Sequence, residues 1–406
     1  MTIDYDPRRP EVIADPFPSF AELRRSDPVH WSAILGGFVL TRYSDVRAVL
    51  FDKRMSADRI TPFRDHLPPP RRDEIKDLLA TLGLWAVFND PPDHTRRRAL
   101  LNKAFTPRAV AALRPTIEAL VARLVRRLAN RDTFDLIADF AYPLPATVIA
   151  GMIGVPAEDL DRFKLWSDDV AAFVGSALAT PDKNERARRG MGELIDYFRA
   201  MVAEHRARPR DDILSALIAA EEQGQGLSED EIVASAILLL FAGHETTTNL
   251  IGNGMLALLR HPDQLALLQA RPALIADAVE EMLRYDGPTQ AMTRIALEDV
   301  VLQGAEGEAR TVRQGDRVFA LLNAANRDPA AFAEPDRFLV ERPDVRHLSF
   351  GYGPHFCLGA PLARLEAEIG IAALLRLPGL ALVDEEPVWS DSFVLRGVKA
   401  LRLRLA

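Results

Sequence analysis

Cysteine occurs once in the 406 residues, at Cys357, and its surroundings are the most informative part of the chain. The segment runs from Phe350 through glycines and a proline to Cys357 and Gly359, and a helical pattern follows from Ala360 to Leu375. A lone cysteine is most often a small buried apolar residue. This one directly precedes a helix, where backbone N–H groups and the helix dipole favour a thiolate. Because a free thiol has a pKa near ~8.5, the position predicts a sulfur used as an anion, either as a nucleophile or as a metal ligand.

The neighbouring residues favour the ligand. A cysteine nucleophile needs a histidine base oriented by a third group, and His355 is too close along the chain to be aimed easily at the same sulfur. A flat, bulky cofactor needs glycines that let the backbone approach it closely. Three glycines around the cysteine provide this: Gly351, Gly353 and Gly359.

Continued as far as Glu366, this segment resembles the haem-binding loop of the cytochrome P450 superfamily. The resemblance implies that Cys357 is the axial thiolate ligand of the iron of haem b. The loop residues implied to touch the cofactor are Phe350, Gly351 and Gly359. The resemblance spans nearly the whole chain, because the order of all the motifs below follows that of the bacterial soluble members.

The longest helical stretch contains a second motif, which begins at Ala242 and includes the pair His244 and Glu245. A zinc-protease helix would need a second histidine four residues after the first, and Thr248 stands there. A zinc site is therefore excluded. A buried helix could merely tolerate Gly243 and the threonines, but so many weak helix formers together are costly.

The same segment resembles the oxygen-activation motif of the haem-thiolate monooxygenases. The resemblance implies that Ala242 and Thr246, one turn apart on one face, border the oxygen-binding side of the haem. Gly243 would permit local opening of the helix. Glu245 and Thr246 would form an acid–alcohol pair that delivers protons during oxygen activation. His244 is expected to be structural.

Two further motifs would hold the fold and the cofactor. Glu281 and Arg284 lie one turn apart on a helix, which alone usually indicates a surface ion pair. They resemble the family's Glu-x-x-Arg motif, whose scaffold is completed by an arginine that we assign to Arg337; it would bridge to Glu281 and hold the loop before the cysteine. The family's clamp on the two haem propionates is matched at His94, Arg98, Arg294 and His355.

The resemblance also implies where the substrate lies. The pocket walls would come from a loop, the lid helices, the central helix, a strand and the terminal turn. The residues concerned are Trp85, Val87, Phe88, Phe173, Val174, Leu238, Leu239, Ala242, Thr289, Met292, Phe393 and Val394. None carries a charge, and desolvating an unpaired ligand charge among them would be costly. We therefore expect a neutral, largely apolar substrate.

The composition is that of an ordinary globular protein, with 48% hydrophobic residues. A formal net charge of -8 argues against nucleic acid as the main partner. One cysteine allows no disulfide framework, which fits a reducing cytoplasm. Residues 1–18 lack the apolar core of a signal peptide, and no apolar run approaches the length of a membrane span. We expect a cytoplasmic monomer without a membrane segment.

The elements that must position these motifs form a mainly α protein with small β-sheets, the cytochrome P450 fold. No repeat or Gly/Ser linker divides the chain, so residues 1–406 are predicted to be a single domain enclosing the haem. Helical periodicity dominates residues 94–230, and a capping box at Ser228 and Glu231 opens the longest helix. Residues 61–90, rich in proline and charge, are predicted to be a mobile loop region. Strands are expected at 37–41, 293–295, 300–303, 317–322 and 394–405.

The predicted function is a haem-thiolate monooxygenase that uses O2 to hydroxylate or epoxidise a small organic molecule. No flavin or iron–sulfur segment is appended, so electrons would come from a separate [2Fe–2S] ferredoxin and its ferredoxin reductase. An acidic protein would then need a local basic patch; its candidates are Arg96, Arg97, Lys103 and Arg364. One rival is a peroxide-driven haem-thiolate peroxygenase, although such enzymes replace the acid–alcohol pair. Another is a non-catalytic haem sensor, which normally couples to an output domain.

Overall fold

The computed structural model describes residues 5–176, 182–222, 227–384 and 386–405. The chain divides into two compact units that interleave along the sequence. Unit 1 comprises residues 1–55, 113–144 and 246–406, and unit 2 comprises residues 56–112 and 145–245. Mostly helical structure with small sheets confirms the predicted fold class. The single domain over 1–406 stays a prediction.

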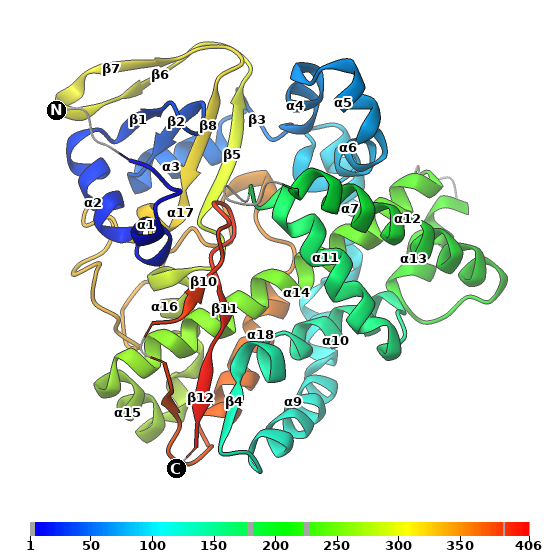
Figure 1. Cartoon of the computed structure of the whole chain (residues 1–406), viewed down its shortest axis with the longest axis vertical. Coiled ribbons are helices and arrows are strands. Elements are labelled where there is room, and N and C mark those ends of the chain that lie inside the picture. Colours follow the sequence, from blue (N-terminus) through cyan, green and yellow to red (C-terminus); the bar gives the residue numbers. More distant parts are fainter. Residues whose placement is uncertain (1–4, 177–181, 223–226, 385, 406) are drawn as a thin grey trace. The chain divides into compact units, whose positions relative to one another are not determined.

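Unit 1 contains the sheets and the helices that surround them (Figure 1). Its helices are α1 (Pro10–Ala14), α2 (Phe17–Ser26), α3 (Tyr43–Phe51), α9 (Arg114–Leu128), α15 (Pro262–Ala270), α16 (Ile275–Asp286), α17 (Leu322–Ala325) and α18 (Ala360–Leu374). Its strands are β1 (Val29–Ser32), β2 (Gly37–Leu40), β4 (Thr133–Asp135), β5 (Ala291–Ala296), β6 (Val300–Gln303), β7 (Ala309–Val312), β8 (Arg317–Leu321), β9 (Ala381–Leu382), β10 (Val388–Trp389), β11 (Val398–Ala400) and β12 (Arg402–Arg404). β3 (Met55–Ser56) lies at the boundary of the units.

The largest sheet has the strand order β1-β2-β8-β5-β3. β2 pairs in parallel with β8, with Val39 opposite Phe319, and β8 pairs in antiparallel with β5, where Phe319 lies opposite Thr293. A hydrophobic core fills the space against α3 and α17, and it includes Leu40, Val46, Val49, Val318, Ala320 and Leu322. Burial of this face fixes the register, since a one-residue slip would turn every inward side chain outward. β5 carries Met292 and Arg294, two of the residues predicted to lie at the pocket and the haem.

Unit 2 is helical apart from its share of β3. Its helices are α4 (Ile60–His66), α5 (Pro69–Glu74), α6 (Lys76–Gly83), α7 (Asp93–Ala104), α8 (Pro107–Ala112), α11 (Leu160–Val174), α12 (Lys183–Ala207) and α13 (Ile213–Glu222), with most of α10 (Pro143–Ile153). The prediction of a mobile loop over residues 61–90 is wrong, because α4, α5 and α6 occupy most of it. Prolines suggested a loop, but Pro69 stands at the first position of α5, where a missing N–H is tolerated.

The longest helix, α14 (Glu229–Arg260), is continuous from unit 2 into unit 1. Its predicted capping box is confirmed: the Ser228 N–H donates to Glu231 Oε2 at 2.9 Å, and the Glu231 N–H donates to Ser228 Oγ at 3.3 Å. The helix ends at Arg260, one residue before the His261-Pro262 pair that predicted its stop.

One of the expected strands is divided in the structure. Residues 394–405 form two short strands, β11 and β12, in different sheets, because Leu401 between them bonds to residues 135 and 136. The strand predicted at 300–303 is confirmed as β6. Within the described ranges, no helix combines the length and the apolar composition needed to cross a membrane.

Candidate functional site

Cys357 lies at the end of a tight loop in unit 1, three residues before α18 begins. Its N–H donates to the Phe350 carbonyl oxygen at 2.9 Å, and the Gly351 N–H donates to the Leu348 carbonyl oxygen at 2.7 Å. Gly351 and Gly353 have φ values of 72° and 76°, a conformation that other residues rarely adopt. The glycines therefore let the chain turn twice within the loop and bring the sulfur to a fixed place before the helix.

The surroundings of the sulfur fit a haem. A Cβ atom added at Gly359 would find one atom within 4 Å, Cys357 Sγ at 4.0 Å, so the backbone beside the sulfur is open to a flat group. A single soft thiolate suits iron whose other ligands come from a porphyrin. Among the residues described, no cluster of three or more His, Cys, Asp or Glu side chains could hold a metal ion. Cys357 is thus the residue that would hold the haem iron.

Strand β5 places Arg294 on the side of the cysteine loop. Met292 contacts that loop, since its Cε lies 3.1 Å from where a Cβ of Gly351 would stand. Arg294, two residues on, shares that face of the strand and is buried. Its Nη1 donates to the Thr293 carbonyl oxygen at 3.0 Å. His355, in the loop itself, is half-buried. Unit 1 thereby positions two of the four predicted propionate donors close to the loop in the fold.

The other two predicted donors belong to unit 2. His94 and Arg98 lie one turn apart on α7, so they share a face of that helix; His94 is buried and Arg98 half-buried. A buried or partly buried cation beside a carboxylate ligand would form charge-assisted hydrogen bonds, the stronger kind. Their role as propionate donors stays a prediction.

The predicted basic patch does not form as expected. Arg97 is buried, and both Arg96 and Arg97 bond to the carboxylate of Glu231 at the start of α14. Arg364 forms a bidentate pair with Glu280, with distances of 2.6 and 2.9 Å. The patch was predicted because an acidic protein would need a basic site for its electron donor, but carboxylates from other helices pair with three of its four members.

Helix α14 is buried over most of its length, and its more accessible middle positions are Leu238, Ala242, Gly243, Glu245 and Thr246. Positions 238, 242, 245 and 246 recur at helical spacing and share one face. This accessible face carries the predicted acid–alcohol pair, Glu245 and Thr246. A hydroxyl and a carboxylate adjacent on such a face can accept and pass on protons.

The structure gives Gly243 a packing role. A Cβ there would stand 2.6 Å from Cγ1 of Ile149 on α10, so the glycine lets the two helices approach. α14 is continuous through this position, and its predicted local opening stays a prediction.

Burial lowers the pKa of His244, which leaves the imidazole neutral at pH 7, and its Nδ1 lies 2.6 Å from the Leu240 carbonyl oxygen. The His244 side chain therefore makes this contact with the backbone of its own helix, as expected of a structural residue.

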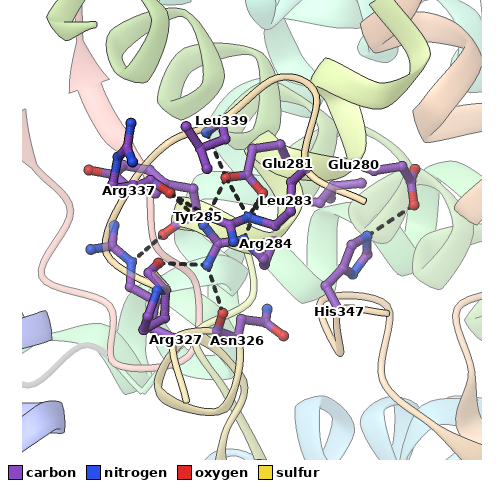
Figure 2. A network of polar contacts seen from close by, with 12 residues as sticks. Glu280, Glu281, Leu283, Arg284, Tyr285, Asn326, Arg327, Arg337, Leu339 and His347 are labelled. Atoms are coloured by element: carbon purple, nitrogen blue, oxygen red, sulfur yellow. Dashed lines mark hydrogen bonds and ion pairs between the residues drawn. The ribbon is translucent and has the colours of Figure 1, made fainter. Parts of the chain in front are cut away.

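Figure 2 shows the network around Glu281 and Arg284 on α16. Both side chains are fully buried, and Arg284 donates to both carboxylate oxygens of Glu281 at 2.7 and 2.8 Å. Arg284 also donates to the carbonyl oxygens of Asn326, Pro335 and Arg337. The pair is thus a buried anchor for the chain before the cysteine loop.

The predicted bridge from Arg337 to Glu281 is wrong. Arg342 makes it instead, with its Nε 3.1 and 3.0 Å from the two carboxylate oxygens. The Arg337 side chain is 61% exposed and pairs with Glu334; its backbone carbonyl oxygen is what joins the network. The segment 333–339 loops around the pair, which turns the later arginine inward and leaves the earlier one in solvent.

A relay of polar contacts extends this anchor toward the cysteine. The backbone carbonyl oxygen of Asn326 accepts from Arg284. The Asn326 side chain accepts the Leu348 N–H on Oδ1 at 2.7 Å and donates from Nδ2 to Ser349 Oγ at 2.8 Å. Leu348 in turn accepts the Gly351 N–H. The scaffold role predicted for Glu281 and Arg284 therefore has a continuous structural path to the loop.

In unit 2, the structure groups several of the apolar pocket candidates. The Trp85 ring stacks on Phe88, with centroids 5.8 Å apart, and lies 5.5 Å from the ring of Phe241 on α14. Phe173 packs edge-on against Phe63 at 5.6 Å. Of the remaining candidates in this unit, Leu239 is buried, Val174 and Leu238 are half-buried and Val87 is exposed.

In unit 1, the strand that carries Met292 and the terminal turn lie next to each other. Thr289 forms an isolated bridge with Leu395, and the Gln290 N–H donates to the Val394 carbonyl oxygen at 2.8 Å. Phe393 packs edge-on against Phe319 of β8 at 5.6 Å. These contacts bring Thr289, Phe393 and Val394 together, next to the strand that carries Met292.

Sequence reasoning missed two groups near the loop. Arg342 gave no signal apart from lying in the same irregular segment as Arg337. Glu280, His347 and Arg364 form a second cluster, whose only signal was an acidic residue beside Glu281. Glu366 is also buried, and desolvation raises the pKa of its carboxyl well above the ordinary range.

Comparison with known proteins agrees with this site. The family model for cytochrome P450 matches residues 38–391. The chain is 42% identical over 405 residues to the cytochrome P450 monooxygenase PikC of Streptomyces venezuelae, covering 97% of this chain and 92% of that protein. It is 38% identical over 419 residues to the 6-deoxyerythronolide B hydroxylase of Saccharopolyspora erythraea, covering 100% of both.

Solved structures give the same result. The crystal structure of CalO2 superposes with a TM-score of 0.90 at 36% identity, covering 100% of this chain and 99% of that chain. P450BioI, solved in complex with an acyl carrier protein ligated to hexadec-9Z-enoic acid, superposes with a TM-score of 0.89 at 37% identity, covering 98% and 99%. Members of this family carry haem whose iron has a cysteine thiolate ligand. The chain therefore belongs to the cytochrome P450 family and is a haem-dependent monooxygenase.

Proposed function

We propose that this monooxygenase hydroxylates or epoxidises a neutral, largely apolar small molecule, with Cys357 as the thiolate ligand of its haem. Electrons would come from a [2Fe–2S] ferredoxin and its reductase. The observation that carries the proposal is the accessible face in the middle of the otherwise buried helix α14, which presents Ala242, Glu245 and Thr246.

The residues of this chain have distinct tasks in the proposal. The haem supplies the oxygen chemistry when bound. Thr246 holds a proton on its hydroxyl at the accessible face, and Glu245 supplies the next proton, so protons reach oxygen from a positioned relay rather than from bulk water. The small side chain of Ala242 leaves room beside them. His94, Arg98, Arg294 and His355 would bind the propionates.

The proposed substrate class rests on the chemistry of the pocket candidates. The side chains of the aromatic group Trp85, Phe88 and Phe241 and of the strand and turn candidates are uncharged. A neighbouring charge, the Arg59 guanidinium, lies over the Phe88 ring, 4.4 Å from its centroid. Relatives are consistent with this class: one is named as a vitamin D(3) 25-hydroxylase and another as a 6-deoxyerythronolide B hydroxylase. The carboxylate of a bound ligand would lose its hydration among these side chains without gaining a counter-charge.

The proposed substrate class can be tested with matched pairs of ligands, in which one member carries a neutral group where the other carries a carboxylate. The measurement is the dissociation constant from the low-spin to high-spin change of the ferric haem. We expect the neutral member to bind more tightly in most pairs. Tighter binding by the carboxylate member in most pairs would refute the proposed class and indicate a basic residue in the pocket.

The exposed edge of the cysteine loop offers a place for an electron donor in unit 1. Phe356 in the loop is 43% exposed and Phe51 on α3 is 62% exposed. Tyr352 lies between loop and helix, 5.9 Å from the Phe51 ring, and its hydroxyl accepts from Arg47 at 2.7 Å. Apolar side chains with a rim of arginine suit a small acidic protein such as a ferredoxin.

Turnover assays distinguish this proposal from the two rival functions. Reduced ferredoxin with O2 should support product formation, and peroxide alone should support it poorly, because the acid–alcohol pair of a monooxygenase is intact. Efficient turnover with peroxide and none with reduced ferredoxin would favour a peroxygenase. Absence of turnover with either, across a ligand library that shifts the spin state, would favour a sensor.

A further inference from the structure

The carboxylate of Glu280 joins three segments of unit 1. It projects from α16, one residue before Glu281, and contacts His347 and Arg364. His347 lies ten residues before Cys357 in the chain, and Arg364 lies seven residues after it on α18. One carboxylate thus holds both ends of the cysteine loop against the same helix.

The His347 side of the cluster joins the carboxylate to the backbone before the loop. The Ser349 N–H donates to Nδ1 of His347 at 3.2 Å. Nε2 is 3.3 Å from Glu280 Oε2, and the imidazole is buried (Figure 2). The ring therefore contacts the carboxylate through one nitrogen while its other nitrogen fixes the backbone just before Phe350.

The Arg364 side is a charged clamp. Its Nε and Nη2 donate to the two oxygens of Glu280 at 2.6 and 2.9 Å, the bidentate geometry that gives strong pairs. The same guanidinium lies over the ring of Phe350, 4.6 Å from its centroid. Since the Phe350 carbonyl oxygen accepts the Cys357 N–H, the clamp reaches the cysteine backbone through one residue.

The protonation of Glu280 fits this role. Burial alone would raise the pKa of its carboxyl, but His347 and Arg364 outweigh burial and lower the pKa to about 2. The group is therefore a carboxylate across the neutral range, and a neutral amide at this position would lose the negative charge that pairs with Arg364.

We infer that Glu280 is a positioning residue for the thiolate: by bonding His347 and Arg364 it fixes the loop that presents Cys357. The inference rests on the proposed role of Cys357. It is separate from the Glu281 network, because neighbouring residues on a helix point about 100° apart, and the carboxylate of Glu281 bonds to Arg284, Arg342 and the Leu339 N–H.

The test uses the holoprotein and compares Glu280→Gln with a control on the same helix, Asp286→Asn. Asp286 also accepts from a buried arginine, Arg396, at 2.6 Å, but that arginine lies outside the cysteine loop. The measurement is the rate at which the ferrous carbonyl complex changes from the strongly red-shifted Soret band of thiolate ligation to the shorter-wavelength band of a lost thiolate. Thermal stability is recorded in parallel.

Glu280→Gln should convert at least about tenfold faster than the wild-type protein, which corresponds to about 1.4 kcal/mol of barrier, whereas Asp286→Asn should stay within about twofold. Equal rates for Glu280→Gln and wild type, or for Glu280→Gln and Asp286→Asn, would overturn the inference. A wild-type protein without the red-shifted band would instead refute the role of Cys357 itself, and the positioning role with it.

If the Glu280→Gln protein fails to fold, a second pair of variants tests the same inference. His347→Gln keeps an N–H donor for Glu280, and His347→Phe removes it while retaining the bulk of the ring. The His347→Gln protein should convert more slowly than the His347→Phe protein. Equal rates for these two variants would contradict a role of the histidine through the carboxylate.

Discussion

Replacing Arg342 by alanine tests the corrected form of the buried network. The change removes two contacts to Glu281 and the donors to the carbonyl oxygens of residues 333, 334 and 337. Breaking a buried ion pair by removing one partner costs about 3–5 kcal/mol. Glu281 would keep Arg284 and one backbone N–H, so we expect the lower end of this range, about 3 kcal/mol.

Arg337→Ala is the matched control, because it removes an exposed arginine from the same segment. Its pair with Glu334 is in solvent on both sides, and such exposed pairs contribute little to stability. The assay is the urea midpoint of the holoprotein, with haem content measured on the same samples. Arg342→Ala should lower both strongly and Arg337→Ala neither. Equal losses in the two variants, or a larger loss in Arg337→Ala, would refute the assignment of Arg342.

Three further outcomes are expected. Thr246→Ala should bind haem and ligands nearly normally but divert reducing equivalents to peroxide, and Thr246→Ser should restore coupling; unchanged coupling in the alanine variant would exclude the relay. Gly154→Ala should lower the free energy of unfolding by about 2 kcal/mol or more, since the φ of Gly154 is 96° and an added Cβ would clash with Asp212 Oδ2. The control is Gly151→Ala in α10, where an added Cβ would have no atom within 4 Å; this change should be neutral or raise the free energy of unfolding by about 0.5–1 kcal/mol. The pKa of Glu280 is depressed from 4.5 to about 2, so the stability that its charge contributes is full above about pH 4.5 and is lost as the pH falls toward 2. Because the side chain is 28% exposed, solvent screening reduces this loss to about 1–2 kcal/mol. The Glu280→Gln protein should lack this part of the acid dependence of the free energy of unfolding.

The sequence predicted those parts of the fold that depend on local chemistry. The ends of α14 followed from a capping box and a proline, and β6 from a short run of β-branched and apolar residues. Residues 61–90 were missed because α4, α5 and α6 are each too short to show a periodic pattern, and proline at the first turn of a helix looks like proline in a loop.

In the candidate site, too, the contacts set by local helical geometry were predictable and those made by distant segments were not. Glu281 and Arg284 are three residues apart on one helix, so their pairing follows from helical geometry. Their third partner comes from a segment without regular structure, where spacing does not determine which arginine turns inward, and Arg342 was missed for that reason. Likewise, nothing local indicates that Glu280 would face residues some seventy and eighty positions later in the chain.

The chemistry of the sulfur was accessible from sequence because one cysteine stands in a motif of glycines before a helix. Its surroundings were not: the open side at Gly359, the contact of Met292 with Gly351 and the clamp of Arg364 over Phe350 are tertiary features. They depend on which helices and strands pack against the loop.

The most direct test of the central claim is the absorption spectrum of the ferrous carbonyl complex in the wild-type protein and in Cys357→His. The wild type should show the strongly red-shifted Soret band of thiolate ligation, and the variant should lack it while retaining haem through imidazole. A red-shifted band that survives in Cys357→His, or that is absent from freshly prepared, fully haem-loaded wild type, would contradict the assignment of Cys357 as the iron ligand.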